Sequence, residues 1–108
     1  MAQLLLNAAT ATGAGTAWKP RDVPATNTYI VHSFQAVGST TNAAGATVVL
    51  VQVSDDGVNY LTLGTITLTL GTSATTDGFS VITDWNFYRG YVSSISGTGA
   101  NVSLYMKG

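Results

Sequence analysis

The sequence predicts an all-β protein, an antiparallel β-sandwich of about seven or eight strands, and three observations lead to this fold class. Thr, Val, Ser, Gly and Asn dominate the 108 residues and Glu is absent; most of these residues form helices weakly, whereas Thr and Val suit a pleated sheet. Glycine-containing turn signals recur along the whole chain. Between them lie short segments with apolar and polar residues in alternation, the pattern of strands in a sandwich or barrel.

Five segments carry the strong strand patterns and two carry weaker ones. The strong strands are expected at residues 29–37, 47–54, 60–70, 87–94 and 101–106, and the weaker ones at 79–82 and in pieces of 3–18. Residues 47–54 begin with apolar side chains at both alternating sets of positions, which predicts a central strand covered on both faces. In the last strand Val102, Leu104 and Met106 are expected to point inward.

The segment 60–70 predicts an interruption within a strand. Leu61 and Leu63 share one parity, while the later apolar residues share the other. Because side chains alternate between the two faces of a sheet, one regular strand cannot place both sets on the same face. The phase changes at Gly64 and Thr65, where we expect a β-bulge or bend.

Residues 1–27 differ from the remainder, and residues 28–108 are expected to form the sandwich domain. The first segment contains Leu4, Leu5, Leu6 and Trp18 and both prolines of the chain. Two interpretations remain open: an extended N-terminal arm that adds a strand to a neighbouring subunit, or an edge strand of the same subunit. The chain start lacks a basic region, so we expect no secretory signal there.

Composition excludes several classes of function. The chain has no cysteine, which excludes disulfide scaffolds, thiolate zinc sites and cysteine nucleophiles. Lys and Arg total four, too few for the basic surface that dominates nucleic-acid binding, and no apolar run reaches the ~18 residues of a membrane helix. Only 8% of residues are charged, so the surface can be covered by a partner at low electrostatic cost.

No catalytic, cofactor-binding or metal-binding residues can be assigned, and we expect neither a cofactor nor enzyme activity. His32 is the one side chain suited to general-base catalysis near neutral pH, and its position within a strand favours a structural or interface role. The acidic segments around Asp56 and Asp77 each precede a glycine and predict turns. Calcium binding at the first of them is the alternative, although its spacing does not match an EF-hand loop.

Ten aromatic residues offer contact area, and four of them fall within residues 85–91. Alternation predicts that some fill the core while Arg89 and Tyr91 lie on an outer sheet face. The candidate interface residues are Leu4, Leu5, Leu6, Trp18, Arg89, Tyr91 and Tyr105. In an alternative interpretation, Tyr60, Trp85, Tyr88 or Tyr91 acts as a stacking platform for a sugar.

Several motifs resemble small structural proteins encoded in the virion gene clusters of tailed bacteriophages. They are ATATGAG at residues 9–15, SDDGVNYLTLGTITL at 54–68, TDGF at 76–79, and a spaced pattern of Trp, Tyr-Arg, Val and ISGTGA between 85 and 102. The hairpin around Asp56 is also similar to one in galactose-binding-like jelly rolls such as discoidin and carbohydrate-binding modules. Tyr60 stands where those sequences often have tryptophan.

The resemblance implies a small jelly-roll-like sandwich on a virion, of the capsid decoration or cement type. It implies binding to the major capsid protein on the outer capsid surface, and assembly in the host cytoplasm. We expect a homo-oligomer, a dimer or trimer, and no binding to nucleic acid or membrane. The alternative function is a carbohydrate-binding or adhesion module of a phage tail or virion, with a surface glycan as its ligand.

Overall fold

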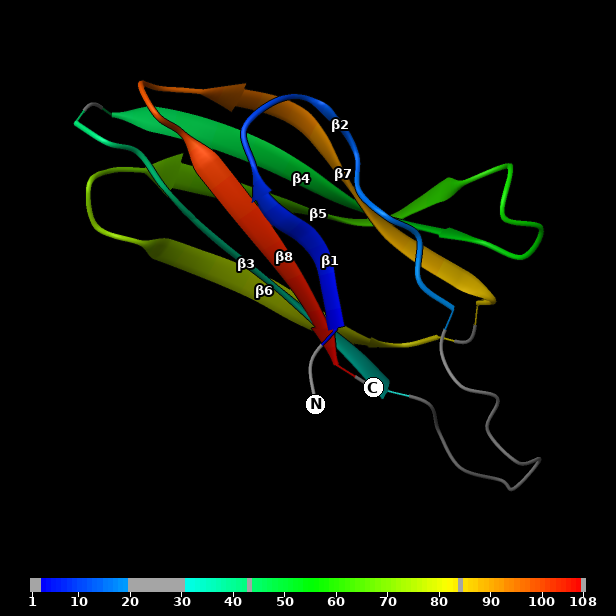
Figure 1. The fold of residues 1–108 in the computed structure, drawn as a ribbon. Coiled ribbons are helices and arrows are strands. Elements are labelled where there is room, and N and C mark those ends of the chain that lie inside the picture. Colours follow the sequence, from blue (N-terminus) through cyan, green and yellow to red (C-terminus); the bar gives the residue numbers. More distant parts are fainter. Residues whose placement is uncertain (1–2, 20–30, 43, 84, 108) are drawn as a thin grey trace.

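Two four-stranded antiparallel sheets pack face to face in the computed structural model, which describes residues 3–19, 31–42, 44–83 and 85–107 (Figure 1). Eight strands form in the described residues, and all of the described pairs between them are antiparallel. They are β1 (Gln3–Ala9), β2 (Gly13–Ala14), β3 (Val31–Ser39), β4 (Gly45–Ser54), β5 (Leu61–Leu70), β6 (Thr75–Ile82), β7 (Phe87–Ser96) and β8 (Asn101–Lys107). The prediction of an antiparallel β-sandwich is confirmed.

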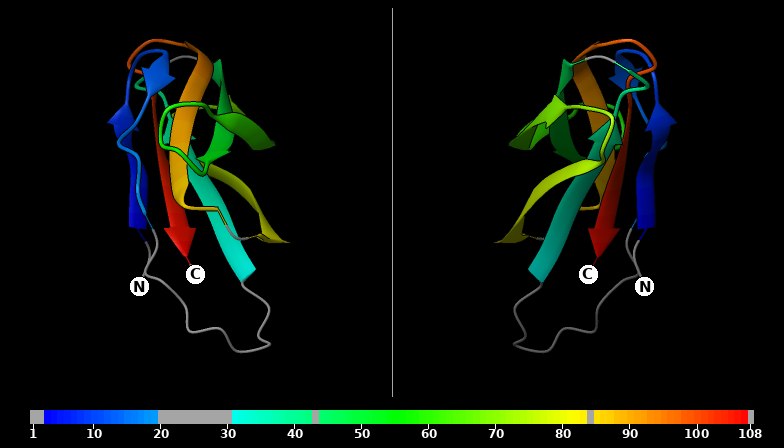
Figure 2. Two further views of the ribbon diagram at one scale, coloured as in Figure 1. Left: turned by 90° about the vertical axis from the view of Figure 1, so that its right-hand side faces the viewer. Right: turned by 90° about the vertical axis from the view of Figure 1, so that its left-hand side faces the viewer.

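The strand order is that of a jelly roll. One sheet has the order β1-β8-β3-β6 and the other β2-β7-β4-β5. Apart from the β4–β5 hairpin, each connection carries the chain from one sheet to the other, as in a double Greek key. Consequently β1 and β2 lie at one side of the sandwich, and β5 and β6 lie at the other (Figure 2).

The core fills the space between the sheets with alternate side chains of each strand. Along β7, Tyr88 and Val92 are fully buried, whereas Arg89 and Tyr91 are half-buried on the outer face. Along β8, the predicted inward residues are the buried ones. The core consists of Leu5, Leu6, Phe34, Ala36, Val49, Val51, Val53, Ile66, Leu68, Leu70, Tyr88, Val92, Ala100, Val102, Leu104 and Met106.

The central strand β4 corrects one prediction. It lies between β7 and β5, as expected for a central strand. Within the described residues, however, only one of its faces is covered: Val49 and Val51 are buried, while Val48 and Leu50 are half-exposed on the outer face. In the part of the chain that the structure describes, the apolar residues at both sets of positions therefore reflect a half-exposed apolar outer face rather than a second covering layer.

The interruption predicted within residues 60–70 is present, one residue earlier than expected. Val51 pairs with Gly64 and Gln52 pairs with Thr62, so Leu63 is the extra residue of a β-bulge. The bulge places Ile66 and the later apolar residues of β5 in the core. A β-carbon on Gly64 would lie 2.5 Å from the Phe79 ring, so the absence of a side chain admits this aromatic residue of β6.

The turn predicted at Asp77 and Gly78 is wrong, because both residues belong to strand β6. Gly78 pairs with Gln35 of β3, and a β-carbon at this position would lie 2.1 Å from the backbone oxygen of Phe34. The glycine therefore allows a close approach of two strands instead of a positive φ angle.

The N-terminal segment forms edge strands of its own subunit. β1 pairs with β8, β2 pairs with β7, and Trp18 forms an isolated bridge with Tyr88. Of the two interpretations, the edge strand describes residues 3–18. Residues 20–30, which contain the expected domain boundary and the first residues of the expected strand at 29–37, lie outside the described part of the chain.

Candidate interaction surface

The outer face of the β2-β7-β4-β5 sheet carries a cluster of aromatic, apolar and polar side chains. Because Leu50 lies opposite Tyr91 and Gln52 lies opposite Arg89, the four form two cross-strand pairs on this face. Tyr60, in the connection that leads into β5, completes the cluster next to Arg89. We call these five residues the aromatic face. The exposed threonines of β5, Thr65, Thr67 and Thr69, share the same side of the sheet.

Arg89 is held in place by neutral partners. Its guanidinium carbon lies 3.8 Å from the centroid of the Tyr60 ring and 6.0 Å from that of Tyr91. Its Nε donates a hydrogen bond to Oε1 of Gln52 at 2.8 Å. A guanidinium group has five N–H donors, so the terminal nitrogens retain the capacity to bind a partner. Because the side chain is already ordered, binding through it costs less conformational entropy.

The loop beside this face is organised by Asp56. Its Oδ1 accepts hydrogen bonds from the Ser54 hydroxyl and from the amides of Val58 and Asn59, each at 2.8 Å, and its Oδ2 accepts one from the Asn59 side chain. The amide of Asn59, followed by that of Val58, holds the pKa of Asp56 far below its usual range. Gly57 supplies the positive φ angle of 74°. These contacts make the segment a structural turn, as predicted.

Asp55, Asp77 and Lys19 each contact a neutral group in the described residues. Asp55 Oδ1 accepts from the amide of Asn86, and Asp77 Oδ1 accepts from that of Gly78. Lys19 Nζ lies 6.0 Å from the centroid of the Phe87 ring. In the described part of the chain, these contacts place Asp55 and Asp77 on backbone amides, and Lys19, like Arg89, lies over an aromatic ring.

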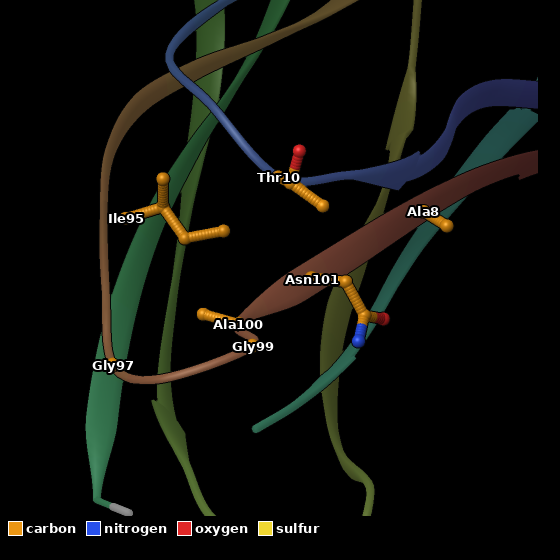
Figure 3. A pocket seen from close by; sticks show the side chains of 7 residues that line it. All are labelled: Ala8, Thr10, Ile95, Gly97, Gly99, Ala100 and Asn101. Atoms are coloured by element: carbon orange, nitrogen blue, oxygen red, sulfur yellow. The ribbon is translucent and has the colours of Figure 1, made fainter. Parts of the chain in front are cut away.

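A shallow groove of about 520 Å³ lies at one end of the sandwich, between the β1–β2 connection and the β7–β8 turn (Figure 3). The Ile95 side chain and the small residues of the turn line it. Its lining consists of Ala8, Thr10, Ile95, Gly97, Gly99, Ala100 and Asn101. None of these side chains titrates, so the groove offers no acid–base chemistry.

His32 lies in the core rather than at a surface. Its residue is 2% exposed, and its ring centroid is 5.0 Å from that of Tyr88. The imidazole therefore packs between the sheets, where a substrate does not reach it. Among the described residues no group of three or more His, Cys, Asp or Glu side chains could hold a metal ion.

The seven predicted interface residues do not form one surface. Leu5 and Leu6 are buried in the chain's own core at 2% and 4% exposure. Trp18 is half-buried against that core and exchanges two backbone hydrogen bonds with Tyr88. Leu4 lies opposite Tyr105 on the other sheet, and Tyr105 is 39% exposed there.

Arg89 and Tyr91 remain together on the aromatic face. Gln52, Tyr60 and Leu50 were not among the predicted interface residues. The signal for Leu50 was present in the sequence, because β4 is apolar at both alternating sets of positions. No sequence signal identified Gln52 as the partner of Arg89, since the cross-strand register brings them together.

Comparison with known proteins supports the fold and does not identify a family. No protein-family model matches the chain, and no curated protein matches it in sequence. The crystal structure of PBSX exported protein XepA is similar, with a TM-score of 0.56 and 17% sequence identity. The similarity covers 98% of this chain and 36% of that one, so the chain spans about a third of the length of XepA. None of the described segments is a helix of the length and apolarity that crossing a membrane requires. At this identity the comparison establishes a shared fold.

Proposed function

We propose that this protein is a structural component of a phage virion, and that it decorates the capsid by binding the major capsid protein on its outer surface. The observation that carries the proposal is the aromatic face, an apolar and aromatic outer surface on a sheet whose central strand the described residues cover on one side only. In this proposal the face packs on the shell and stabilises contacts between capsid subunits. Assembly would take place in the host cytoplasm.

The composition of the aromatic face favours binding to a protein. Tyrosine and arginine are enriched in protein interfaces and account for a large share of binding hot spots. Arg89 is the one charged side chain among its five residues, and it is already held on Tyr60 and Gln52. Burying the face therefore removes little charge from water. Weak individual contacts suffice on a capsid, because many copies bind a repeating surface.

The fold similarity supports a phage origin. XepA belongs to PBSX, a phage-related element, and shares the sandwich over nearly the whole of this chain. The motifs that resemble virion structural proteins point the same way. Neither identifies the capsid as the attachment site, so attachment to purified particles decides the proposal.

Binding to a glycan has less support from the geometry. Of the four aromatic residues considered as sugar platforms, Tyr88 is fully buried and Trp85 is packed against the core. The guanidinium of Arg89 covers one ring face of Tyr60. A sugar stacks on an open aromatic ring face. Of these four residues, Tyr91 alone keeps a suitable position.

We also propose that the protein acts without catalysis. The buried position of His32 supports this, since general-base catalysis requires a group within hydrogen-bond reach of a bound substrate. The groove at the end of the sandwich contains no titratable side chain.

The test is attachment to particles. Cells that produce the phage would express tagged wild-type protein, the Tyr91→Ala variant or the Tyr105→Ala variant, and particles would be purified on a density gradient. We expect wild type and Tyr105→Ala to migrate with heads and to raise their heat resistance. Removing a hot-spot tyrosine should lower the affinity of Tyr91→Ala about tenfold or more. Absence of the wild-type protein from particles would refute virion attachment, and equal occupancy by both variants would refute the aromatic face as the contact.

A further inference from the structure

The four edge strands in the described part of the sandwich differ in how well their free backbone edges are protected. β1 contains two register shifts and a positive φ angle at Ala8, and β2 is two residues long. In β6 the carboxylate of Asp77 accepts a hydrogen bond from the amide of Gly78. Bulges, short strands and charged side chains are the devices by which proteins prevent pairing at a sheet edge.

β5 lacks most of this protection. It is ten residues long and contains neither a charged residue nor a proline. Its bulge lies at Leu63, near one end, and leaves the stretch from Gly64 to Leu70 regularly paired with β4. This strand therefore offers a long, uncharged and regular edge.

Backbone hydrogen bonds establish which backbone groups of β7 point away from β4. The amide and carbonyl of Tyr88 bond Trp18, and the carbonyl of Gly90 accepts from Gly15. In an antiparallel sheet the N–H and C=O of one residue point to the same neighbouring strand, and successive residues alternate. The backbone N–H and C=O groups of Arg89 and Tyr91 consequently point toward β4.

The same alternation extends across β4 to β5. Leu50 lies opposite Tyr91, so its backbone groups bond β7. Because successive residues alternate, the backbone groups of Val49 bond β5, where Ile66 is the partner. The backbone groups of Thr65 and Thr67 therefore point to the free edge. An independent contact agrees with this assignment, because the Thr75 hydroxyl donates to the carbonyl of Thr69 from outside the ladder at 3.0 Å.

We infer that the free edge of β5 pairs with β5 of a second copy of this chain, antiparallel across a two-fold axis, so that two four-stranded sheets join into one of eight strands. The axis passes beside Ile66, which places Thr65 of each copy opposite Thr67 of the other. Both residues then exchange two backbone hydrogen bonds with their partners. Thr69, whose carbonyl is already occupied by Thr75, is left out of the pairing.

The sequence of β5 is self-complementary in this arrangement. A two-fold interface brings identical surfaces together. Here threonine meets threonine on the outer face, a favourable cross-strand pair, and no charge opposes its like. The arrangement uses the edge of the sheet and leaves the aromatic face uncovered, so self-association does not depend on the proposed attachment to a virion.

The experiment is sedimentation velocity over a range of concentrations, with two proline variants. Thr67→Pro removes an amide that points outward, so it breaks no internal ladder bond, and proline is tolerated at such edge positions. Ser80→Pro is the matched control on β6. The Gly78 amide donates to Asp77 rather than to the neighbouring strand. Ser80 lies two residues further along β6, so its amide also points away from β3. We expect wild type and Ser80→Pro to dimerise reversibly, and Thr67→Pro to associate at least tenfold more weakly.

Hydrogen exchange provides a second readout. Peptides covering residues 61–70 should exchange more slowly as the protein concentration rises, whereas peptides from β6 should not change. If circular dichroism shows that Thr67→Pro is unfolded, Thr67→Lys replaces it, because two lysines beside the axis repel each other. The inference is overturned if the wild type is monomeric up to about 1 mM, or if a folded Thr67→Lys or Thr67→Pro variant dimerises as well as the wild type.

Discussion

Two adjacent residues of β4 provide a direct test of which side of the sheet is covered. Val51 is fully buried between the sheets, and Leu50 is half-buried on the aromatic face. Replacing each by alanine removes apolar atoms from environments that differ mainly in burial. The expected free-energy costs therefore differ, even though the two side chains are neighbours in the same strand.

The magnitudes follow from burial. Val51→Ala removes two buried methyl groups, worth about 0.8 kcal/mol each in transfer free energy. The cavity left in a closely packed core raises the total cost to ~2–4 kcal/mol. Leu50→Ala removes a larger side chain that is only partly withdrawn from water, and we expect a cost of about 1 kcal/mol.

Urea denaturation followed by circular dichroism measures both costs. We expect the midpoint of Val51→Ala to fall well below that of Leu50→Ala, with the slope m unchanged for both. Attachment to particles should show the reverse order: Leu50→Ala should lose more attachment than Val51→Ala, because only Leu50 belongs to the proposed contact face. Equal losses of stability, or a larger loss for Leu50→Ala, would show that the face assignment of β4 is wrong.

Two further predictions concern glycine and the acidic loop. Gly78→Ala should destabilise the protein by ~2 kcal/mol or more, since its β-carbon meets the backbone of Phe34. Gly71→Ala, whose β-carbon meets nothing within 4 Å, should be near neutral, and urea denaturation measures both variants. Asp56→Asn should remove a pH-dependent contribution to stability. The folded-state pKa of Asp56 is lowered, so its contribution is present above the ordinary value of 3.8 and is lost as the pH falls through the folded-state pKa. The difference between the unfolding curves of wild type and variant should therefore shrink as the pH falls below 3.8 toward 2. A difference that stays constant would contradict the assigned hydrogen bonds.

Local patterns in the sequence were sufficient for most of the strands and for the faces of β7 and β8. The alternation around Val102, Leu104 and Met106 predicted the buried side of β8, because a two-residue period maps directly onto the two faces of a sheet. The same reasoning detected the bulge beside Gly64, since a change of phase within an apolar strand demands an extra residue. It also placed Arg89 and Tyr91 on an outer face.

Strand pairing decided what the sequence by itself left open. Whether residues 3–9 reach a neighbour or complete their own sheet depends on a partner almost a hundred residues away, and the structure pairs them with β8. The turn predicted at Gly78 was wrong because a glycine also serves close strand contact, which only the position of Phe34 reveals. Gln52 meets Arg89 through cross-strand register. The sequence thus determined the period and polarity of most strands, whereas long-range pairing, a property of the folded chain, determined which strands and side chains meet.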